Sequence, residues 1–442
     1  MLNSRSYLFV TWEGGGNVPP VLGIARRMVE HGHDVRVLAE PCLRDTVVGF
    51  GGRFEAFSRY FDREDCARQD IMGDWQAKTP IGALRHIFDN VVFGPAPIVA
   101  EETRRAIERK RPDVVVVDYL LPGALVAAEA AGISRVVLFH SPEYLPGPGK
   151  PAAGSGFLPR GDFIGRARDG LFNRILLTLI GSYVPVMNGI RRDYGLPLLK
   201  SAEDLVGEYH RADRRLILTS EVFDFPITPP PANVHYVGPV LDDPDWVEAW
   251  SDPWTASDER PLVVAGLSTT FQNQAAVLQN IITALGMLQV RGLVTTGPAM
   301  NGTPFNVPAN VVVTPSAPHS WVFPDAAAVI THGGHGTVVR ALSCGVPVLC
   351  LPMGRDQNDN AARVVARGAG WQLKPSAGPA RIAGAVQRLL AQPDYRANAR
   401  RLGQVFTNDA AAGRAIRELE SLGTEAVTEF IVDRDVLAIA AT

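Results

Sequence analysis

A glycine-rich segment followed by polar residues is the part of this chain best suited to chemistry. His332–Thr337 reads His-Gly-Gly-His-Gly-Thr, and Asp356 and Gln357 follow it. The glycines let a ligand approach the backbone, and the His332 and Thr337 side chains can donate to phosphate oxygens. A carboxylate beside a carboxamide suits neighbouring hydroxyl groups of a sugar. The spacing therefore predicts a site for a sugar joined to phosphate.

The flanking elements place these residues at one edge of a sheet. The apolar run Ala328–Thr331 predicts a strand that ends at the glycine-rich segment, and Val338–Ser343 predicts the helix that follows. Free N–H groups at the start of a helix, together with the helix dipole, bind anions. The next predicted strand, Val346–Cys350, ends shortly before Asp356. The phosphate and sugar residues are therefore expected at the same sheet edge.

Alternating apolar runs and amphipathic segments predict two α/β domains. In the first half the predicted elements are strands Tyr7–Trp12, Val35–Ala39 and Val114–Asp118, and helices Pro20–His31 and Gly123–Ala131. In the second half they are strands Leu262–Ala265, Gly292–Thr295 and Val311–Val313, with helices near Asn273–Gln289 and Asn360–Arg367, besides those around the glycine-rich segment. At 442 residues, two domains are the expected number.

Proline-rich stretches suggest where the domains are joined. The segment 226–261 carries three consecutive prolines and two Asp-Pro pairs, typical of a connection. We predict an N-terminal domain over 1–240, a linker over 241–260, a C-terminal domain over 261–425, and a tail over 426–442 that packs back on the first domain. The proline-rich stretch 142–169 predicts a loop, and Leu171–Ile190 predicts one helix packed in the core.

Composition excludes several classes of protein. A net charge of -3 with dispersed basic residues gives no field for nucleic acid, and no run of 18 apolar residues could span a bilayer. The N-terminus predicts a strand, not a signal peptide, so a cytoplasmic location is expected. The four cysteines show no disulfide or zinc spacing, and we expect small buried apolar residues and no metal or cofactor. The oligomeric state is open, a homodimer being one option.

The region His319–Gly370 resembles the nucleotide-sugar box of family 1 glycosyltransferases, especially bacterial natural-product members. The likeness extends to Gly266–Thr270, Thr296–Gly297 and Ala317–His319. It implies a GT-B fold, in which two doubly wound Rossmann-like domains face a central cleft. The resemblance also implies that the N-terminal domain, 1–240, binds the acceptor and that the C-terminal domain, 261–425, binds the nucleotide sugar. Carried over residue by residue, it implies a donor site made of Ser268, Thr269, Gly297, Ser316, Ala317, His332, Gly334, Gly336, Thr337, Asp356 and Gln357.

One departure from the family bears on the donor. Plant members have a glutamate eight residues after the first histidine of the box, where it holds the ribose hydroxyls, and here that position is Arg340. Bacterial members that use dTDP sugars are more similar, and a deoxyribose has no 2′-hydroxyl to be held. The resemblance therefore favours a dTDP sugar over a UDP sugar.

A second departure concerns the base. Most members have Gly-His-Val-Asn-Pro in the first loop, and its histidine deprotonates the acceptor; here Asn17 stands at that position and cannot take a proton. Asp118 matches the aspartate that orients this histidine in many members. Either Asp118 or Glu13 is the base, with a pKa raised by burial, or the acceptor is acidic and Asn17 only orients it. A third explanation is an auxiliary partner of another transferase that binds without turnover.

The acceptor side gives weaker signals. His140 follows the apolar run Val136–Phe139 at the predicted cleft edge, and it is either a hydrogen-bonded core histidine or a reserve candidate for the base. Trp75 and Phe88, among other aromatic residues, suit a hydrophobic acceptor such as a polyketide or macrolide aglycone. The sequence therefore predicts an inverting glycosyltransferase acting on a hydroxyl of a hydrophobic small molecule. A sugar-nucleotide 2-epimerase would need acid and base carboxylates near the sugar that cannot be placed.

Overall fold

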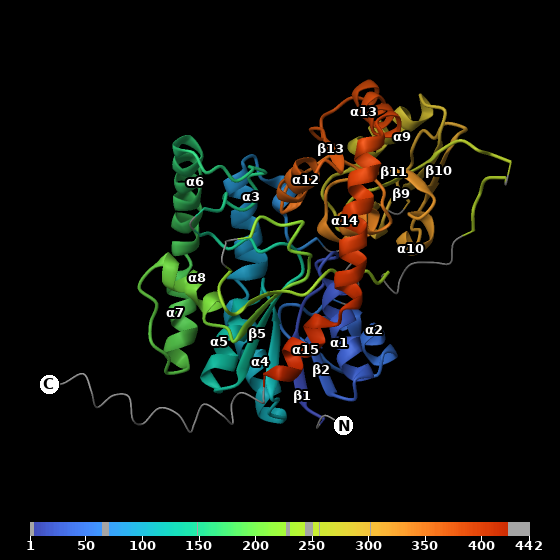
Figure 1. Cartoon of the computed structure of the whole chain (residues 1–442). Coiled ribbons are helices and arrows are strands. Elements are labelled where there is room, and N and C mark those ends of the chain that lie inside the picture. The colour runs from blue at the N-terminus through green and yellow to red at the C-terminus, as the bar shows by residue number, and fades with distance from the viewer. Residues whose placement is uncertain are drawn as a thin grey trace.

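Two parallel sheets, each covered by helices, lie side by side in the computed structural model (Figure 1). The structure describes residues 4–63, 70–147, 149–226, 230–243, 251–255, 257–300 and 302–422. The first sheet is formed by the N-terminal half and the second by the C-terminal half. The prediction of two doubly wound α/β sheets is thus confirmed.

The first sheet has seven strands in the order β3-β2-β1-β4-β5-β6-β7, and every pairing is parallel. The strands are β1 (Ser6–Val10), β2 (Asp34–Ala39), β3 (Arg53–Ala56), β4 (Val114–Asp118), β5 (Ser134–Phe139), β6 (Arg214–Ile217) and β7 (Val234–Tyr236). The strand order reverses between β1 and β4. The loops that follow β1 and β4 therefore diverge at this point and leave a crevice, where open sheets bind ligands.

The helices of this half are α1 (Val18–Glu30), α2 (Arg44–Gly49), α3 (Pro80–Ile87), α4 (Ala96–Arg109), α5 (Pro122–Ala130), α6 (Phe163–Gly181), α7 (Val184–Asp193) and α8 (Ala202–His210), with short turns at Pro41–Leu43, Asp74–Gln76 and Phe88–Val92. The predicted signals bound α1: prolines lie in its first turn, and Gly32, with φ of 85°, follows its end. Its apolar face, which includes Val21, Ile24 and Met28, is buried against the sheet. The first strand-helix-strand unit is confirmed.

The predicted core helix over 171–190 is wrong in its bounds, and its predicted burial holds only from Leu176 onward, where Leu176, Leu179 and Met187 are buried. The helix begins earlier, because the Asp162 carboxylate caps it by accepting from the Gly165 N–H at 2.7 Å, so the predicted loop over 142–169 ends at 162. A break at 182–183 separates α6 from α7. Several apolar side chains of α6 are exposed, namely Phe163, Ile164, Leu171, Phe172 and Ile175. No single helix in the described ranges is long and apolar enough to cross a membrane; α6 and α7, bent by 45°, pass together by length and composition only.

The second sheet has six parallel strands in the order β10-β9-β8-β11-β12-β13. They are β8 (Leu262–Gly266), β9 (Arg291–Thr295), β10 (Val311–Thr314), β11 (Ala326–Thr331), β12 (Val348–Cys350) and β13 (Gly370–Gln372). The helices are α9 (Ala275–Gly286), α10 (His319–Val322), α11 (His335–Ser343), α12 (Gln357–Ala366), α13 (Pro379–Ala391), α14 (Pro393–Ala411) and α15 (Arg414–Ser421), with a turn at Pro298–Met300. Here the order reverses between β8 and β11.

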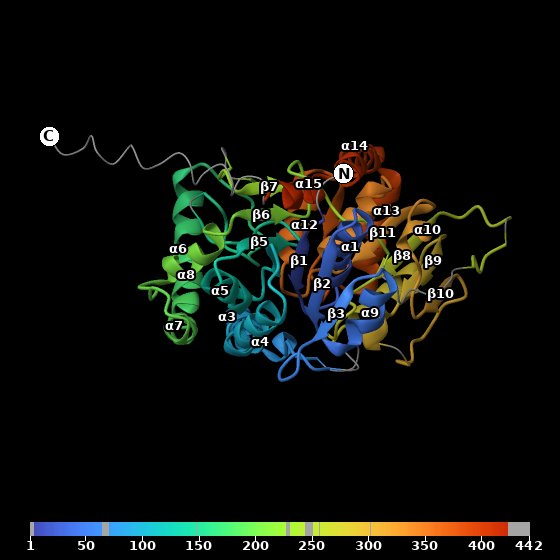
Figure 2. The ribbon, with the colours of Figure 1, turned by 90° about the horizontal axis from the view of Figure 1, so that it is seen from below.

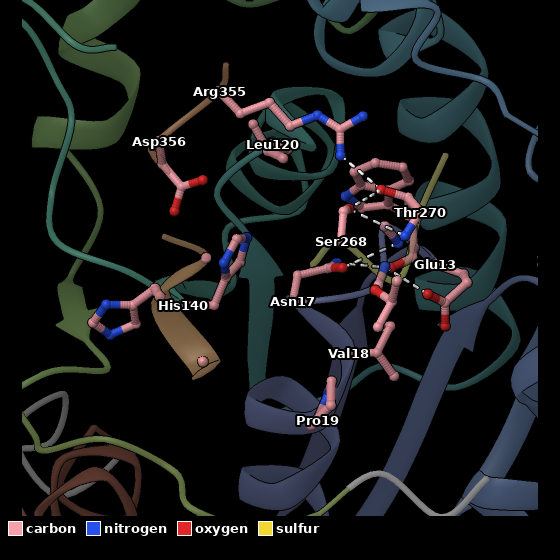
Figure 3. A pocket seen from close by; sticks show the side chains of 18 of the residues that line it. Glu13, Asn17, Val18, Pro19, Leu120, His140, Ser268, Thr270, Arg355 and Asp356 are labelled. Carbon is pink, nitrogen blue, oxygen red and sulfur yellow. Dashed lines mark hydrogen bonds between the residues drawn. The ribbon is translucent and has the colours of Figure 1, made fainter. Parts of the chain in front are cut away.

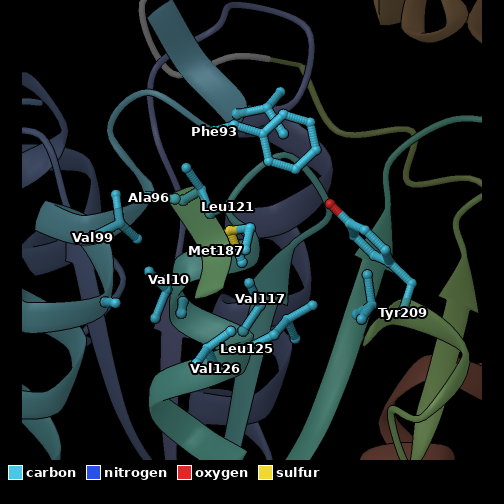
Figure 4. Close-up of a cluster of buried hydrophobic side chains, with 14 of the residues drawn as sticks. Val10, Phe93, Ala96, Val99, Val117, Leu121, Leu125, Val126, Met187 and Tyr209 are labelled. Carbon is cyan, nitrogen blue, oxygen red and sulfur yellow. The ribbon is translucent and has the colours of Figure 1, made fainter. Parts of the chain in front are cut away.

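Each sheet is packed on both faces. In the first half, α4 and α5 cover one face and α1 the other, as the view from below shows (Figure 2). Figure 4 shows the side chains between the first sheet and α5, among them Val117, Leu121 and Leu125. Buried apolar clusters on both faces of the second sheet are arranged in the same way. The buried clusters on both faces of each sheet fix the two sheet edges that carry the site.

The chain returns to the first half at its described end. α14 leaves the second half and α15 packs against α1 (Figure 1). The Tyr7 hydroxyl donates to the Leu419 carbonyl at 3.2 Å, and Arg5 donates to the Glu420 carbonyl at 2.6 Å. The predicted tail, 426–442, lies outside the described residues, as does part of the predicted linker, and the domain boundaries stay a prediction. The prediction for the cysteines is wrong for Cys42, which is in a disulfide.

Candidate functional site

One cavity of about 830 Å³ lies at the facing carboxyl edges of the two sheets (Figure 3). Its walls are the loops after β1, β4 and β5 in the first half and after β8, β9, β10, β11 and β12 in the second. All eleven residues predicted for the donor site line it. Of the residues predicted for the acceptor side, Glu13, Asn17, Phe88 and His140 line it, whereas Asp118 and Trp75 do not.

The turn from β11 into α11 has the geometry of a phosphate cradle. Gly333 has φ of 93°, and a Cβ on it would meet the Gln357 carbonyl oxygen at 2.9 Å. A Cβ on Gly334 would lie 2.5 Å from His332 Nε2, so any larger residue there would displace the His332 ring or the turn. Gly334 precedes α11, and the first N–H groups of this helix, which include those of the cavity residues Gly336 and Thr337, have no intrahelical acceptor. This end of α11 can bind an anion.

His332 is a neutral donor in this site. Burial, aided by the nearby Arg355 guanidinium, lowers the pKa of His332 to about 3. The Thr331 hydroxyl lies 3.3 Å from His332 Nδ1 and fixes the ring. A neutral imidazole has one N–H to offer, so positive charge at the cradle comes from the helix dipole and from Arg355 and not from a protonated His332.

The predicted sugar residues begin the neighbouring helix, α12. The Asn360 amide donates to Asp356 Oδ2 at 2.8 Å and to the Gly333 carbonyl at 2.9 Å, so one side chain braces both the carboxylate and the glycine turn. Burial raises the pKa of Asp356. Gln357 is more fully engaged than predicted: its Oε1 accepts from the Met353 N–H at 2.8 Å, and its Nε2 donates to Gln272 at 2.8 Å.

The loop after β8 forms the opposite wall of the donor side. The Ser268 and Thr270 hydroxyls are 3.0 Å apart, and Ser268 is buried. The first half approaches closely here, because a Cβ on Gly15 would lie 2.3 Å from Thr269 Oγ1. Gly297, with φ of 72°, and the pair Ser316–Ala317 line the remaining end, where the resemblance places the base.

Arg340 lies at the same end of the cavity, on α11. Its guanidinium donates to the Asp242 carbonyl oxygen from the connecting segment, and burial lowers the pKa of Arg340. Arg340 Nε and Asp243 Oδ1 are buried and have no hydrogen-bond partner within the described part of the chain. One donor and one acceptor are thus free close to the position where a family glutamate would hold a ribose.

The polar residues of the first half form a linked group at the reversal of strand order. Asn17 Nδ2 donates to Asp118 Oδ2 at 2.8 Å and to the Trp12 carbonyl at 2.7 Å, and Asn17 Oδ1 accepts from the Gly14 N–H at 3.0 Å. His140 Nε2 lies 3.8 Å from Asp118 Oδ1. Figure 3 shows Asn17 and His140 side by side, with Asp356 on the opposite wall. Asn17, Asp118, His140 and Asp356 were all named as candidates from the sequence, but the hydrogen bond between Asn17 and Asp118 and the position of His140 beside Asp118 were not predicted.

The other candidates differ in position. Burial, with a contribution from Glu40, raises the pKa of Glu13 to about 7, and its Oε1 accepts from the Gly15 N–H at 2.6 Å. Phe88 faces the cavity and packs against Phe93, with ring centroids 5.2 Å apart. Trp75 lies outside the cavity and packs edge-on against Phe271 of the second half at 5.1 Å.

Arg355 and His335 are two polar cavity residues that the sequence analysis did not assign to the site. Arg355 joins the halves: it pairs with Asp74 through contacts of 2.7 and 3.0 Å and donates to the Thr270 hydroxyl at 2.7 Å. His335 lies within the box, and its Nδ1 is buried without a partner in the described residues. The place of His335 in the box was a signal, whereas nothing in the sequence marked Arg355 as a contact to residue 74. No group of three or more His, Cys, Asp or Glu side chains in the described ranges is placed to hold a metal.

Comparisons with known proteins agree with this geometry. Residues 281–422 match the family described as Erythromycin biosynthesis protein CIII-like, C-terminal domain. The chain is 29% identical to 4'-demethylrebeccamycin synthase of Lentzea aerocolonigenes, covering 94% of this chain and 99% of that one. It is 31% identical to a PGL/p-HBAD biosynthesis glycosyltransferase of Mycobacterium tuberculosis (strain ATCC 25177 / H37Ra), covering 70% of each.

Solved structures show the same fold. The glycotransferase of kitacinnamycin superposes with a TM-score of 0.74 at 20% identity, covering 95% of this chain and 99% of that one. The glycosyltransferase VinC in complex with DTDP superposes with a TM-score of 0.63 at 18% identity, covering 93% and 98%. Two doubly wound halves whose carboxyl edges share one cavity make this a GT-B protein. It belongs to the family 1 glycosyltransferases of the natural-product type and is a glycosyltransferase enzyme. The alternative explanation, an auxiliary partner that binds without turnover, is therefore rejected.

Proposed function

We propose that this enzyme transfers a sugar, with inversion, from a dTDP sugar to a hydroxyl of a bulky hydrophobic acceptor. One observation supports this most directly: a single cavity joins a phosphate cradle to an apolar chamber. Holding both reactants in one enclosed space converts their reaction into an effectively unimolecular step and can contribute many powers of ten to the rate.

The donor assignment rests on the second half. We place the diphosphate at the α11 N-terminus, where His332, Gly334, Gly336 and Thr337 supply donors, with help from Ser268 and Thr269 on the facing loop. Asp356 and Gln357 hold the sugar, and Gly297, Ser316 and Ala317 line the base. The solved structure of a relative in complex with DTDP supports a dTDP sugar as the donor, as does the arginine at position 340.

The acceptor assignment rests on the first half. Its part of the cavity is walled by buried or half-buried apolar side chains, including Met72, Phe88, Phe93, Leu176, Ile180 and Val206. A chamber of this kind favours a large apolar molecule, since each 100 Å² of apolar surface removed from water contributes about 2.5 kcal/mol. The relative named 4'-demethylrebeccamycin synthase makes natural-product aglycones the first class of acceptor to test.

The chemistry needs charge stabilisation at the leaving group. As the bond from the anomeric carbon to the diphosphate breaks, negative charge grows on the diphosphate oxygens. The N–H groups that begin α11, the His332 side chain and the Thr337 side chain all line this part of the cavity, and donors that are in place before the reaction need no reorganisation during it. We propose that these donors supply most of the stabilisation of the leaving group.

The test is a matrix of donors and acceptors. dTDP and UDP sugars are each incubated with polycyclic hydroxylated acceptors and with small hydrophilic alcohols, and nucleoside diphosphate release and product mass are followed. We expect turnover with polycyclic acceptors and higher kcat/KM for dTDP sugars. Thr337→Val should raise the donor KM about 10-fold, whereas Thr283→Val on the exposed face of α9 should not. Turnover confined to small hydrophilic alcohols would contradict the proposal.

A further inference from the structure

Asn17 occupies the position of the family base but is already fully used. Both hydrogens of its amide are donated, one to Asp118 and one to the Trp12 carbonyl, and its oxygen accepts from the Gly14 N–H. The side chain is 3% exposed. Its bonds tie the loop after β1 to the end of β4. Asn17 is therefore built as a positioning residue.

Asp118 is shielded from the cavity. It is 0% exposed and does not line the cavity. Its Oδ2 accepts from Asn17 and from the Thr11 hydroxyl at 3.4 Å, and its Oδ1 accepts from the Leu120 N–H at 3.0 Å. An acceptor hydroxyl cannot reach these oxygens without displacing protein groups. A carboxylate held in this way can orient a neighbouring group but cannot take a proton from a substrate directly.

His140 is the titratable group that joins Asp118 to the cavity. β4 and β5 are neighbours, with Asp118 opposite Leu138, so the residue two positions beyond Leu138 lies on the same side as the carboxylate. His140 Nε2 is 3.8 Å from Asp118 Oδ1, is buried, and has no hydrogen-bond partner in the described residues. The ring is 15% exposed and lines the cavity, which leaves Nδ1 as the nitrogen accessible to a ligand.

We propose that His140 is the general base of this enzyme and that Asp118 is its positioning carboxylate. The inference rests on the proposed function. His140 thus takes over, from the end of β5, the task that a histidine in the loop after β1 performs in the family. The Tyr119 ring lies 5.0 Å from the His140 ring on the same wall of the cavity. Asp356, which we place at the sugar, lies on the opposite wall (Figure 3), so His140 lies between the acceptor side and the donor side.

The step balances in atoms and charge. The acceptor oxygen forms its bond to the anomeric carbon while its proton passes to His140 Nδ1. The bond from that carbon to the diphosphate oxygen breaks, and its electron pair leaves with the nucleoside diphosphate. The imidazolium formed has Nε2 3.8 Å from Asp118 Oδ1, and the negative charge of this carboxylate stabilises the positive charge. The proton is then released to solvent or to the departing diphosphate.

Glu13 is the competing base, but its carboxylate is directed elsewhere. Its Oε1 accepts from Gly15 within its own loop at 2.6 Å, and no contact links it to Asp118 or Asn17 through side-chain atoms in the described residues. The charged groups next to Glu13 are Glu40 and Arg63, and Gly15, which binds its Oε1, packs against Thr269 of the loop after β8. We assign Glu13 to the donor-side wall and not to proton removal.

The test compares His140→Gln with the wild type under saturating donor and acceptor. We expect kcat to fall about 10²-fold or more while the Kd for dTDP stays within about 2-fold, which also shows that the variant folds. His31→Gln, on an exposed turn whose side chain is 52% exposed, is the matched control and should keep full activity. If the wild type turns over a substrate and His140→Gln matches its kcat, the inference fails while the proposed function stands. If no acceptor is turned over by the wild type, the proposed function itself fails.

Two further measurements separate a base from a structural residue. The loss in kcat caused by His140→Gln should be large for an aliphatic alcohol and should shrink for a nitrophenol, whose proton needs little help; an equal loss with both would overturn the assignment. Asp118→Asn should lower kcat in the wild type but cause little further loss in His140→Gln. Fully multiplicative losses in the double variant would show that Asp118 does not act through His140.

Discussion

The two walls of the cavity are built by different means. On the donor wall, the cradle comes from six consecutive residues, and its geometry follows from local backbone: a left-handed glycine, a glycine under a histidine ring, and a helix start. Behind and on the acceptor wall, the Asn17, Asp118 and His140 side chains come from the loop after β1, the end of β4 and the segment after β5, about 100 and 20 residues apart in the sequence. The contrast teaches that phosphate recognition is local, whereas proton removal depends on strand order.

Substituting Gly334 should break the donor wall with the largest effect. Gly334→Ala adds a Cβ that would lie 2.5 Å from His332 Nε2, so the ring or the turn must move. We expect the Kd for dTDP to rise about 100-fold, equivalent to about 2.7 kcal/mol, as measured by calorimetry. Gly384→Ala, in the middle of α13 with open space around it, is the control and should leave binding unchanged. Unchanged binding in Gly334→Ala would contradict the cradle.

This contrast also explains what could be predicted from sequence. The glycine-rich segment determines its geometry locally, so the strand, turn and helix around 328–343 were predictable from these residues, and the donor residues on other loops were predictable from the family resemblance. The Arg355–Asp74 pair was not, because no periodicity marks a contact between residues 281 positions apart. The bounds of α6 were missed because the Asp162 cap outweighed the surrounding prolines. The burial of α6 was mispredicted since apolar periodicity does not say which face meets a partner.

A loop of the acceptor half rests on a donor-half carboxylate, which makes their junction sensitive to pH. Asp359 accepts from the Gly154 and Gly156 N–H groups at 2.6 and 2.7 Å, and burial raises the pKa of Asp359 to about 6. Because the folded state holds this proton more tightly than the unfolded state, its contribution to stability is full below about pH 4 and is lost as pH rises through 6.

The corresponding variant is Asp359→Asn, which removes the titration and keeps one acceptor oxygen. The free energy of unfolding of the wild type minus that of the variant should rise by about 2 kcal/mol between pH 7 and pH 4, measured by urea denaturation at each pH. Taking the difference removes the titration of the other carboxyl groups. A difference that stays constant over this range would show that Asp359 does not titrate between its folded and unfolded values.

The ion pair that joins the walls should have a smaller effect on catalysis. Arg355 contacts both oxygens of Asp74 and the Thr270 hydroxyl, and the two charged side chains are 14% and 5% exposed. Arg355→Lys keeps the charge but cannot make all three contacts. We expect the donor KM to rise about 10-fold with a smaller change in kcat. Arg381→Lys, exposed on α13, is the control. An unchanged KM would mean that the halves are held together without this pair.

The smallest expected effect concerns the ribose. Arg340→Glu places a carboxylate where it can accept from a 2′-hydroxyl, which a UDP sugar has and a dTDP sugar lacks. One net hydrogen bond contributes about 1 kcal/mol, so the ratio of kcat/KM for dTDP to UDP sugars should fall about 5-fold. Arg340→Gln also loses the guanidinium bond to the Asp242 carbonyl but adds no carboxylate, so it should leave the ratio close to that of the wild type. If both variants change the dTDP-to-UDP ratio of kcat/KM equally, the Arg340 guanidinium itself discriminates between the two nucleotides. Asp243 Oδ1, which has no hydrogen-bond partner among the described residues, is then the next acceptor to test.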